Sequence, residues 1–536
     1  MKAKTTRSGA RALVECLERA GVETVFGYPG GNVLDVLDCL RDSRLRFVLN
    51  RHEQGAVHSA DGYSRATGRP GVVLVTSGPG LTNTITGLGC ACMDGVPMVL
   101  ICGQVELGRI GTDAFQEADT TGLTRSVSKH NFLVKTADEI PETVAQAFYI
   151  ATHGKPGPVV IDIPCDVQRA LTSAAYPERI SLRAYHPECA ASARDVFALA
   201  KWLNAARRPV IYAGGGVIAA DAARDLAAIA EKANVPVVTT LMGIGSFDTA
   251  HRLAMGMAGI YGTRAARTAL ARADFILALG VRFNDRVTEG AKFSRGVRIV
   301  QVDSDPSAID KNVSVTMGIV ADIKDLLTVV ASRVKGAEHS EWLTMLNGLK
   351  PIKPKYVPLH RDLIMPQAVI DAVAEVTNGC CTIVTDVGQH QMFAARRFPH
   401  SRPRRFITSG GMGAMGFGIP AAIGAAIGDV QSKVVAIVGD GGAQMTSEEL
   451  IVAAREKLSI AFIVVNNGSL GMIRQMQKRY FVGDYSNPDF VMLARAHGVK
   501  AARVTEIEKL VGAVAKAVRA KGPYLLEVVV DGEATV

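Results

Sequence analysis

Residues 434–467 read VVAIVGDGGAQMTSEELIVAAREKLSIAFIVVNN. The apolar runs VVAIV and AFIVV have the β-branched composition of buried strands, and the segment between them carries apolar residues at helical spacing. This pattern predicts a strand–helix–strand unit whose strands lead into Asp440 and Asn467. Because the carboxyl ends of parallel strands form a ligand crevice, the two side chains are expected at the same edge of a sheet.

Oxygen ligands at neighbouring strand ends can hold Mg²⁺, which keeps phosphate oxygens among its other ligands. The 27 residues from Asp440 to Asn467 (467 − 440) suit a single crossover. Gly441 and Gly442 would let the backbone approach a diphosphate, and the following helix N-terminus would add partial positive charge. Gly-Asp-Gly followed by a double Asn is typical of thiamine diphosphate sites, so we interpret the stretch as a magnesium-diphosphate clamp. The alternative is a tight turn and an Asn-Asn loop.

The chain has 536 residues, of which 48% are hydrophobic and 21% are charged. It is too long for one hydrophobic core, and domains of about 100–200 residues indicate three. No apolar run approaches the roughly 18 residues that span a bilayer, so the membrane class is excluded. The N-terminal sequence lacks the apolar core of a signal peptide, and we expect a cytoplasmic protein.

The composition also indicates which classes of binding partner to expect. The nine cysteines lack the spacing of zinc sites and are expected to be reduced. A net charge of +9 is modest for this length, and only 6% of the residues are aromatic. Nucleic-acid binding needs a basic face with aromatic side chains, so that class is excluded. We assign the excess positive charge to anionic cofactors and small carboxylates.

Three segments alternate strand and helix signals: residues 1–165, 190–335 and 358–536, with a linker at 166–190. Their strands end in glycine, proline or polar clusters, as in parallel sheets. The predicted fold class is therefore α/β, with three doubly wound parallel-sheet domains. The first and last segments share strand-to-glycine-loop patterning, which indicates related halves.

A dinucleotide site is one alternative for the third segment, because residues 411–416 (GMGAMG) match G-x-G-x-x-G. The ribose-binding acid expected about 20 residues later, at a strand end, would be Asp440. That residue is better explained as a metal ligand, so a nicotinamide dehydrogenase is the weaker interpretation.

The middle segment has its own candidates. A Gly-Gly-Gly run at 214–216, and Arg282, Asp285 and Arg286 after another strand, could hold a second phosphate-bearing cofactor. Ordinary strand-to-helix turns are an equal alternative. Asp303, just beyond a strand, could accept from a ribose hydroxyl, which favours a nucleotide slightly.

Several motifs together resemble the catalytic subunit of the acetohydroxyacid synthase (acetolactate synthase) family: FGYPGG, NRHEQGAVHSADGYSRATGRPGV, LVTSGPGLTN, IGTDAFQEAD, GVRFNDRVT and SGGMGAMGFGIPAA, besides the clamp. The resemblance runs from about residue 8 to 531. It implies thiamine diphosphate, Mg²⁺ and a non-redox FAD as cofactors, and small 2-ketoacids as substrates. It also implies a homodimer or homotetramer with active sites between the first segment of one chain and the third of another, and allows a small regulatory subunit.

By this resemblance, Glu53 hydrogen-bonds the cofactor's aminopyrimidine and relays its proton, which needs a general acid/base shielded from water. Met415 resembles the apolar wedge that bends the cofactor, and the Gly413 carbonyl accepts from its amino group. The implied Mg²⁺ ligands are Asp440, Asn467 and the Ser469 carbonyl. Other positions assigned to thiamine diphosphate are Pro29, Gly30, Thr76, Gly80, Asn83, Gln389, His390, Gly439, Gly441 and Gly442.

The family's FAD lies in the middle segment, where Asn284 replaces the first Asp of the usual R-F-D-D-R. The implied flavin positions are Gly214, Gly215, Thr240, Leu241, Gly280, Arg282, Asp285, Arg286, Asp303 and Asp322.

On the substrate side, the family's catalytic positions fall on Gly31, Phe115, Gln116 and Lys129 besides Glu53. Arg286 lies near the second substrate by resemblance, where a cation suits a carboxylate. Met476 stands where the biosynthetic family carries Trp, and Ile260 replaces a Met. A flat wall of the acceptor pocket thereby becomes a flexible one.

The expected function is decarboxylation of pyruvate and condensation with a second 2-ketoacid, foremost pyruvate, to 2-acetolactate and CO₂, as in branched-chain amino acid biosynthesis. One alternative is a related carboligase or acyltransferase with a different acceptor in a specialised pathway. A non-catalytic paralogue is the other, and the presence of Glu53, Gln116, Asp440 and Asn467 argues against it.

Overall fold

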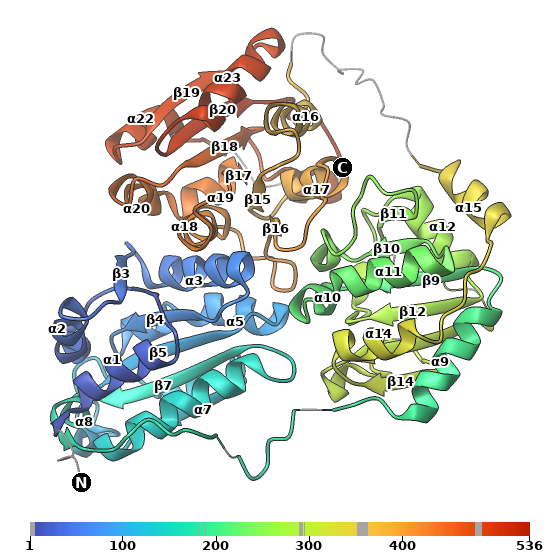
Figure 1. Cartoon of the computed structure of the whole chain (residues 1–536). Helices are drawn as coiled ribbons and strands as arrows, with labels where there is room; N and C mark the ends of the chain where they lie inside the picture. The colour runs from blue at the N-terminus through green and yellow to red at the C-terminus, as the bar shows by residue number, and fades with distance from the viewer. Residues whose placement is uncertain are drawn as a thin grey trace.

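The computed structural model describes residues 6–180, 182–187, 189–288, 293, 295–350, 363–477 and 485–536. Figure 1 shows three lobes, each built on a six-stranded sheet flanked by helices. All strand pairings within these sheets are parallel. The predicted fold class is therefore confirmed. The domain boundaries stay a prediction, and their parts at 1–5 and 358–362 lie outside the described residues.

The first sheet has the strand order β3-β2-β4-β5-β7-β6. Its inner strands β2, β4, β5 and β7 are fully buried because helices cover both faces of a parallel sheet. A short antiparallel pair, β1 (Arg7–Ser8) with β8 (Leu171–Thr172), flanks it. The strands are β2 (Thr24–Gly27), β3 (Arg46–Leu49), β4 (Gly71–Val75), β5 (Met98–Gln104), β6 (His130–Leu133) and β7 (Pro158–Pro164), and the main helices are α1 (Gly9–Arg19), α2 (Leu34–Arg41), α3 (Glu53–Thr67), α5 (Ile85–Asp94) and α7 (Ile140–Thr152).

The third sheet has the order β16-β15-β17-β18-β20-β19. Numbered within each domain, the first and third sheets share the order 2-1-3-4-6-5, as expected of related halves. The strands are β15 (Thr382–Thr385), β16 (Phe406–Ile407), β17 (Val434–Gly439), β18 (Ile460–Asn466), β19 (Lys500–Val504) and β20 (Tyr524–Val529), and the main helices are α16 (Pro366–Thr377), α17 (Gln389–Arg397), α18 (Gly418–Gly428), α21 (Gly471–Met476), α22 (Phe490–Ala496) and α23 (Ile507–Arg519).

The central sheet has a different order, β11-β10-β9-β12-β13-β14, which is 3-2-1-4-5-6 within its domain. This is the strand order of dinucleotide-binding sheets. Helix α9 begins after Ser192, whose side chain accepts from Asp195 N at 3.1 Å. The strands are β9 (Pro209–Ala213), β10 (Val237–Thr239), β11 (Ala254–Met257), β12 (Phe275–Leu279), β13 (Arg298–Asp303) and β14 (Met317–Val320), and the main helices are α9 (Ala193–Ala205), α11 (Ala223–Ala233), α12 (Arg264–Arg272) and α14 (Ile323–Ala331).

The strand orders locate the ligand crevices. In an open parallel sheet, ligands bind beyond the carboxyl ends of the strands where the order reverses. These points lie between β2 and β4, between β9 and β12, and between β15 and β17. The glycine-rich and charged loops singled out in the sequence follow these strands.

Helices α3 and α18 join the first and third domains and lie side by side in Figure 1. Glycines allow their close approach: a Cβ on Gly62 would stand 2.0 Å from Ala421 O, and one on Gly424 would stand 1.7 Å from Ser59 O. The Ser59 hydroxyl also donates to Pro420 O at 3.0 Å. The two helices therefore fix how these domains sit within one chain.

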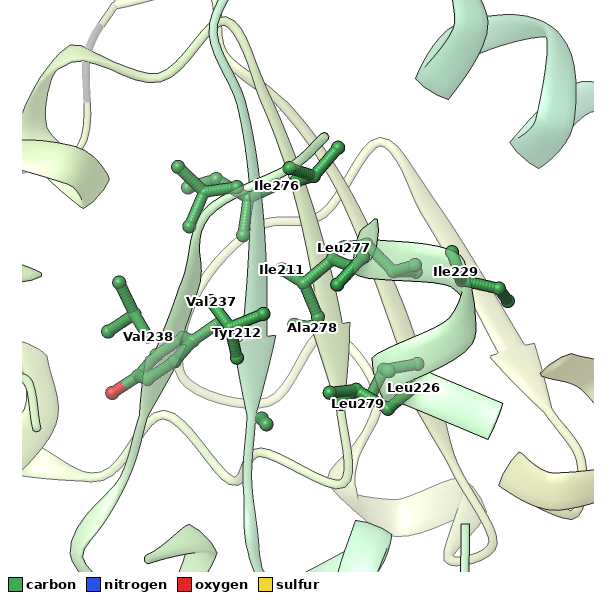
Figure 2. Packing of buried hydrophobic residues seen from close by; sticks show 14 of the residues in the cluster. Ile211, Tyr212, Leu226, Ile229, Val237, Val238, Ile276, Leu277, Ala278 and Leu279 are labelled. Atoms are coloured by element: carbon green, nitrogen blue, oxygen red, sulfur yellow. The ribbon is translucent and has the colours of Figure 1, made fainter. Parts of the chain in front are cut away.

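The central core consists of aliphatic side chains from the sheet and from α11 (Figure 2). Tyr212 on β9 is fully buried in it beside its register partner Val238, and its hydroxyl has no hydrogen-bond partner among the described residues. Within the described ranges, every helix is too short or too polar to cross a bilayer.

Candidate active site

The clamp residues follow neighbouring strands, as the sequence predicts. β17 and β18 pair in parallel, with Gly439 opposite Val465, so Asp440 and Asn467 emerge at the same sheet edge. Asp440 is buried; Oδ1 accepts from Gly441 N at 3.0 Å and Oδ2 accepts from Asn487 Nδ2 at 2.9 Å. Burial raises the pKa of Asp440 despite these hydrogen bonds. A nearby cation would favour its charged form.

The single helix expected after Asp440 is broken into α19 (Asp440–Met445), a 3-10 turn η6 (Ser447–Glu449) and α20 (Leu450–Arg455). The break falls at Thr446, whose φ of −142° is not helical. Its hydroxyl donates instead to Gly416 O at 2.9 Å. The predicted strand–helix–strand unit is therefore confirmed, with its helical part divided into two short helices.

A magnesium site here would use few carboxylates. The described residues hold no cluster of three or more His, Cys, Asp or Glu side chains suited to a metal. Mg²⁺ commonly takes one or two carboxylates and completes its shell with phosphate and water oxygens. Asp440 with the amide oxygen of Asn467 fits that pattern, and the buried Ser469 Oγ has no partner among the described residues. The donor set therefore fits Mg²⁺ bound together with a diphosphate.

Beyond β15, the His390 ring lies between two glycines. A Cβ on either Gly388 or Gly439 would stand 2.9 Å from its Cε1. Burial lowers the pKa of His390 to about 4, so the imidazole is neutral at pH 7. Its buried Nε2 has no partner in the described part of the chain. The neutral imidazole therefore packs against the clamp strand at Gly439.

The loop at 410–416 carries Met415 over the clamp. A Cβ on Gly441 would stand 3.0 Å from Met415 Cε, so the end of the Met415 side chain lies against the Gly441 backbone. Asp386, which follows β15, accepts from Gly416 N at 3.0 Å and from Gly418 N at 2.8 Å. Burial raises the pKa of Asp386 to about 6. The sequence patterns did not point to this carboxylate, which ties the loop to the strand end.

In the first domain, Glu53 begins α3 and is buried. Its Oε2 accepts from Asn83 Nδ2 at 2.9 Å, and a Cβ on Gly80 would stand 3.7 Å from its Oε1. Thr76 lies against Gly30, where a Cβ would stand 2.4 Å from the Thr76 side chain. The structure thus brings these five residues into one cluster beside Pro29 and Gly31.

Glu449 reaches this cluster from the third domain and was not singled out by the sequence either. It is fully buried, and its Oε1 accepts from Arg51 N at 2.9 Å and from His52 N at 3.1 Å. Its Oε2 accepts from Asn50 Nδ2 at 2.9 Å. Burial raises the pKa of Glu449 to about 7. It holds the backbone at the start of α3, where Glu53 stands.

The residues of the first domain that were predicted on the substrate side do not lie together in the structure. Gln116 has a φ of +61° and lies against Gly78, where a Cβ would stand 2.8 Å from Gln116 O. Its neighbour Phe115 is 88% exposed. Lys129 lies elsewhere, donating to His153 O at 2.8 Å and also to Ile150 O. Burial lowers the pKa of Lys129 to about 8.

One cavity of about 1420 Å³ is lined by residues of all three domains, mostly of the third and central ones. Single small-molecule sites commonly measure about 300–1,000 Å³, so there is room for more than one ligand. The first-domain site residues predicted from the sequence, and Gly214, are not among the residues that line it. The predicted residues that do are Gln389, His390, Gly413, Met415, Gly439, Asp440, Gly441, Gly442, Asn467, Ser469, Gly215, Thr240, Leu241, Gly280, Arg282, Asp285, Arg286, Asp303, Asp322, Ile260 and Met476.

The central wall has the features of a nucleotide site. Its two strand ends meet closely, since a Cβ on Gly214 would stand 1.9 Å from Gly280 O. Asp303, at the end of β13, is buried, and burial raises its pKa. The buried Asn284 Oδ1 has no partner among the described residues and lies on the cavity wall. These groups fit a ligand with hydroxyl or amide donors.

Two of the residues predicted to lie near the second substrate are neighbours on the cavity wall. Ile260 N donates to Arg286 O at 3.1 Å, which places these residues side by side. Met476 ends α21 and is 62% exposed. The hydroxyl of Tyr261 contacts Met472 Sδ at 3.2 Å and so joins the central domain to α21.

Three family profiles match the chain: the thiamine pyrophosphate enzyme N-terminal TPP binding domain at residues 7–123, the central domain at 196–330 and the C-terminal TPP binding domain at 386–528. The acetolactate synthase large subunit of Corynebacterium glutamicum is 44% identical over 99% of this chain and 88% of its own length.

Acetolactate synthase isozyme 3 large subunit of Escherichia coli is 41% identical, covering 98% of this chain and 95% of the relative. A probable acetolactate synthase large subunit of Methanocaldococcus jannaschii is also 41% identical, over 98% and 92%. The chain therefore belongs to the acetolactate synthase large-subunit family of thiamine pyrophosphate enzymes.

Proposed function

We propose that this chain is a thiamine diphosphate-dependent acetolactate synthase, which decarboxylates pyruvate and joins the two-carbon unit to a second pyruvate, giving 2-acetolactate and CO₂. The observation that carries the proposal is the cavity itself. Its walls combine the clamp, the Met415 loop and an acceptor end with Arg286. A phosphate site alone would need neither the wedge nor the cation.

Thiamine diphosphate, when bound, supplies an electron sink for the carbanion left by decarboxylation. Asp440, Asn467 and Ser469 would hold Mg²⁺ against its diphosphate. His390, whose ring is neutral at pH 7, would line the diphosphate side of the site, with an Nε2 that has no partner among the described residues. Met415, packed over Gly441, would set the shape of the cofactor.

Glu53 is the proposed acid/base. Asn83 holds one of its carboxylate oxygens at 2.9 Å, leaving the other to hold or deliver a proton. Its burial shields that proton from water. Arg286 would orient the carboxylate of the second 2-ketoacid, and Gln116 is proposed to lie on the substrate side of the completed site.

FAD is the proposed occupant of the central part of the cavity. The strand order 3-2-1-4-5-6 favours a dinucleotide, and the volume exceeds one small ligand. The unpartnered Asn284 oxygen, among the described residues, offers an acceptor where the family usually carries an Asp. We propose a structural role for the flavin, since the proposed reaction has no net redox change.

A dimer is proposed because Glu53 does not line the cavity that holds the clamp of its own chain. The Glu53 cluster of a second copy would complete that site. Phe115, which is 88% exposed, would be covered in the same assembly. The relatives are named large subunits, and we extend to this chain the proposal of a small regulatory partner.

A carboligase with another acceptor is the second candidate. Met476 and Ile260 give the acceptor end flexible apolar side chains. For the favoured function we expect pyruvate to be the better acceptor and 2-ketobutyrate to be preferred less than in a Trp-bearing enzyme. A competition assay that finds strong 2-ketobutyrate preference would contradict this assignment.

The test is incubation with pyruvate, thiamine diphosphate, Mg²⁺ and FAD, followed by identification of the product. We expect 2-acetolactate and CO₂ in equal amounts. Replacing Glu53 by Gln should lower turnover by about 10²–10⁴-fold, the usual contribution of a general acid/base. Omitting thiamine diphosphate should abolish turnover. The absence of CO₂ release from the folded, cofactor-saturated protein would refute the proposal.

A further inference from the structure

Asp94 lies at the end of α5, outside the residues that the function has used so far. Its side chain is fully buried and accepts from Arg65 Nη2 at 2.9 Å. It also accepts from Gly410 N of the third domain at 3.0 Å and faces Arg282 Nη2 of the central domain at 3.6 Å. One carboxylate from the first domain thus contacts both others at the cavity wall.

Arg282 stands among the proposed flavin residues, two positions beyond Gly280. Its Nη1 donates to Met93 O, and its Nη2 faces Asp94. The guanidinium is therefore held from the first-domain side at two points. Because a buried or half-buried cation is stabilised by such a carboxylate, the Asp94 charge determines where Arg282 can point.

Gly410 opens the loop that carries Gly413 and Met415. The next residue, Gly411, packs against the Asp94 side chain, since a Cβ on Gly411 would stand 2.7 Å from Asp94 Oδ1. The start of the thiamine-side loop and the flavin-side arginine therefore share one anchor. A shift of either would have to move Asp94 or lose its contact.

We propose that Asp94 is a positioning residue that couples the two cofactor regions, so that flavin bound against Arg282 holds the 410–416 loop in the form that receives thiamine diphosphate. This inference rests on the proposed function. It explains what a flavin without redox work contributes to the neighbouring site. Coupling between binding sites is reciprocal, so each cofactor should tighten the binding of the other by the same factor.

The experiment measures the dissociation constant of FAD by its fluorescence quenching, without and with saturating thiamine diphosphate and Mg²⁺. In the wild type we expect about 5-fold or more tightening, the lower end of common coupling factors. Asp94→Asn should weaken FAD binding and bring the ratio of the two constants close to one. A ratio unchanged in a folded Asp94→Asn protein would overturn the inference.

Asp61→Asn is the matched control. Asp61 is also a fully buried carboxylate on Arg65, with Oδ1 2.5 Å from Nε, and neither Gly410 nor Arg282 is among its hydrogen-bond or ion-pair partners in the described structure. This variant carries the same loss of buried charge and should keep the wild-type ratio. Loss of the ratio in both variants would indicate general disruption and would overturn the specific role of Asp94.

A second variant covers the case in which Asp94→Asn does not fold. Arg282→Met removes the partly exposed end of the pair and should also bring the ratio close to one, with the circular dichroism of the wild type; a retained ratio would refute the coupling route. Where both single variants fold, the double variant should show the same ratio of FAD dissociation constants as Arg282→Met alone, because both substitutions act through one contact. Wild-type protein that binds no FAD would instead refute the proposed flavin site itself.

Discussion

Replacing Gly424 by alanine tests the packing of α3 on α18. The added methyl group would stand 1.7 Å from Ser59 O, whereas ordinary contact begins at 3.4 Å, so the helices must separate by about 1.7 Å (3.4 − 1.7). Overpacking of this kind costs about 1–3 kcal/mol. The separation also endangers the hydrogen bond from Ser59 to Pro420 O, worth a further ~0.5–1.5 kcal/mol. We expect a loss of about 1.5–4.5 kcal/mol.

The assay is urea unfolding followed by circular dichroism, with turnover of pyruvate measured in parallel. Gly512→Ala in α23 is the control, since a Cβ added there would meet no atom of the described residues within 4 Å. That helical change should stabilise the protein by about 0.5–1 kcal/mol. Because Glu53 begins α3, Gly424→Ala should also lower turnover. A Gly424→Ala protein with the unfolding midpoint of the wild type would refute the close packing of the two helices.

Three further outcomes follow from buried polar groups. The pKa of Glu449 is raised to about 7 from an ordinary 4.5, so its contribution to stability is complete below pH 4.5 and is lost as pH rises through 7. Between pH 5 and 8, the free energy of unfolding of Glu449→Gln in urea should rise relative to that of the wild type by on the order of 2–3 kcal/mol. Parallel pH curves for the two proteins would contradict this. Tyr212→Phe removes a buried hydroxyl that has no partner among the described residues, and should raise the urea midpoint by the equivalent of about 1 kcal/mol; a lower midpoint would show that the hydroxyl is satisfied. Asn487→Ala removes the amide that orients Asp440 at 2.9 Å and should weaken activation by Mg²⁺ about 10–100-fold, measured by titration at saturating thiamine diphosphate, with unchanged activation as the contrary result.

The sequence predicts the fold and the third-domain site well, because both depend on local signals. Apolar runs ending in glycine or polar residues give the parallel strands, and the carboxyl-end rule then places Asp440 and Asn467 together. The strand order that makes these ends meet at a crevice, 2-1-3-4-6-5, was not predicted, since it depends on which distant strands pair.

The remaining site residues act over long separations in sequence. Asp386 reaches a loop about 30 residues away, Glu449 reaches the backbone of Arg51 about 400 residues earlier, and Asp94 reaches Gly410. Each is an ordinary acid in its local sequence. Only the packing of domains on one another buries it and provides its donors, so no local pattern distinguishes it from a solvated carboxylate.

The glycine contacts between α3 and α18 are reciprocal: Gly62 lies against a carbonyl of α18, and Gly424 lies against a carbonyl of α3. Self-complementary contact of this kind characterises isologous dimers, in which the same surface serves both partners. Together with the shared strand order, it is what the fusion of two copies of one ancestral domain would leave behind. Each copy could then lose half of an originally duplicated chemistry, one keeping the acid at the start of its helix and the other keeping the acid at the end of its strand.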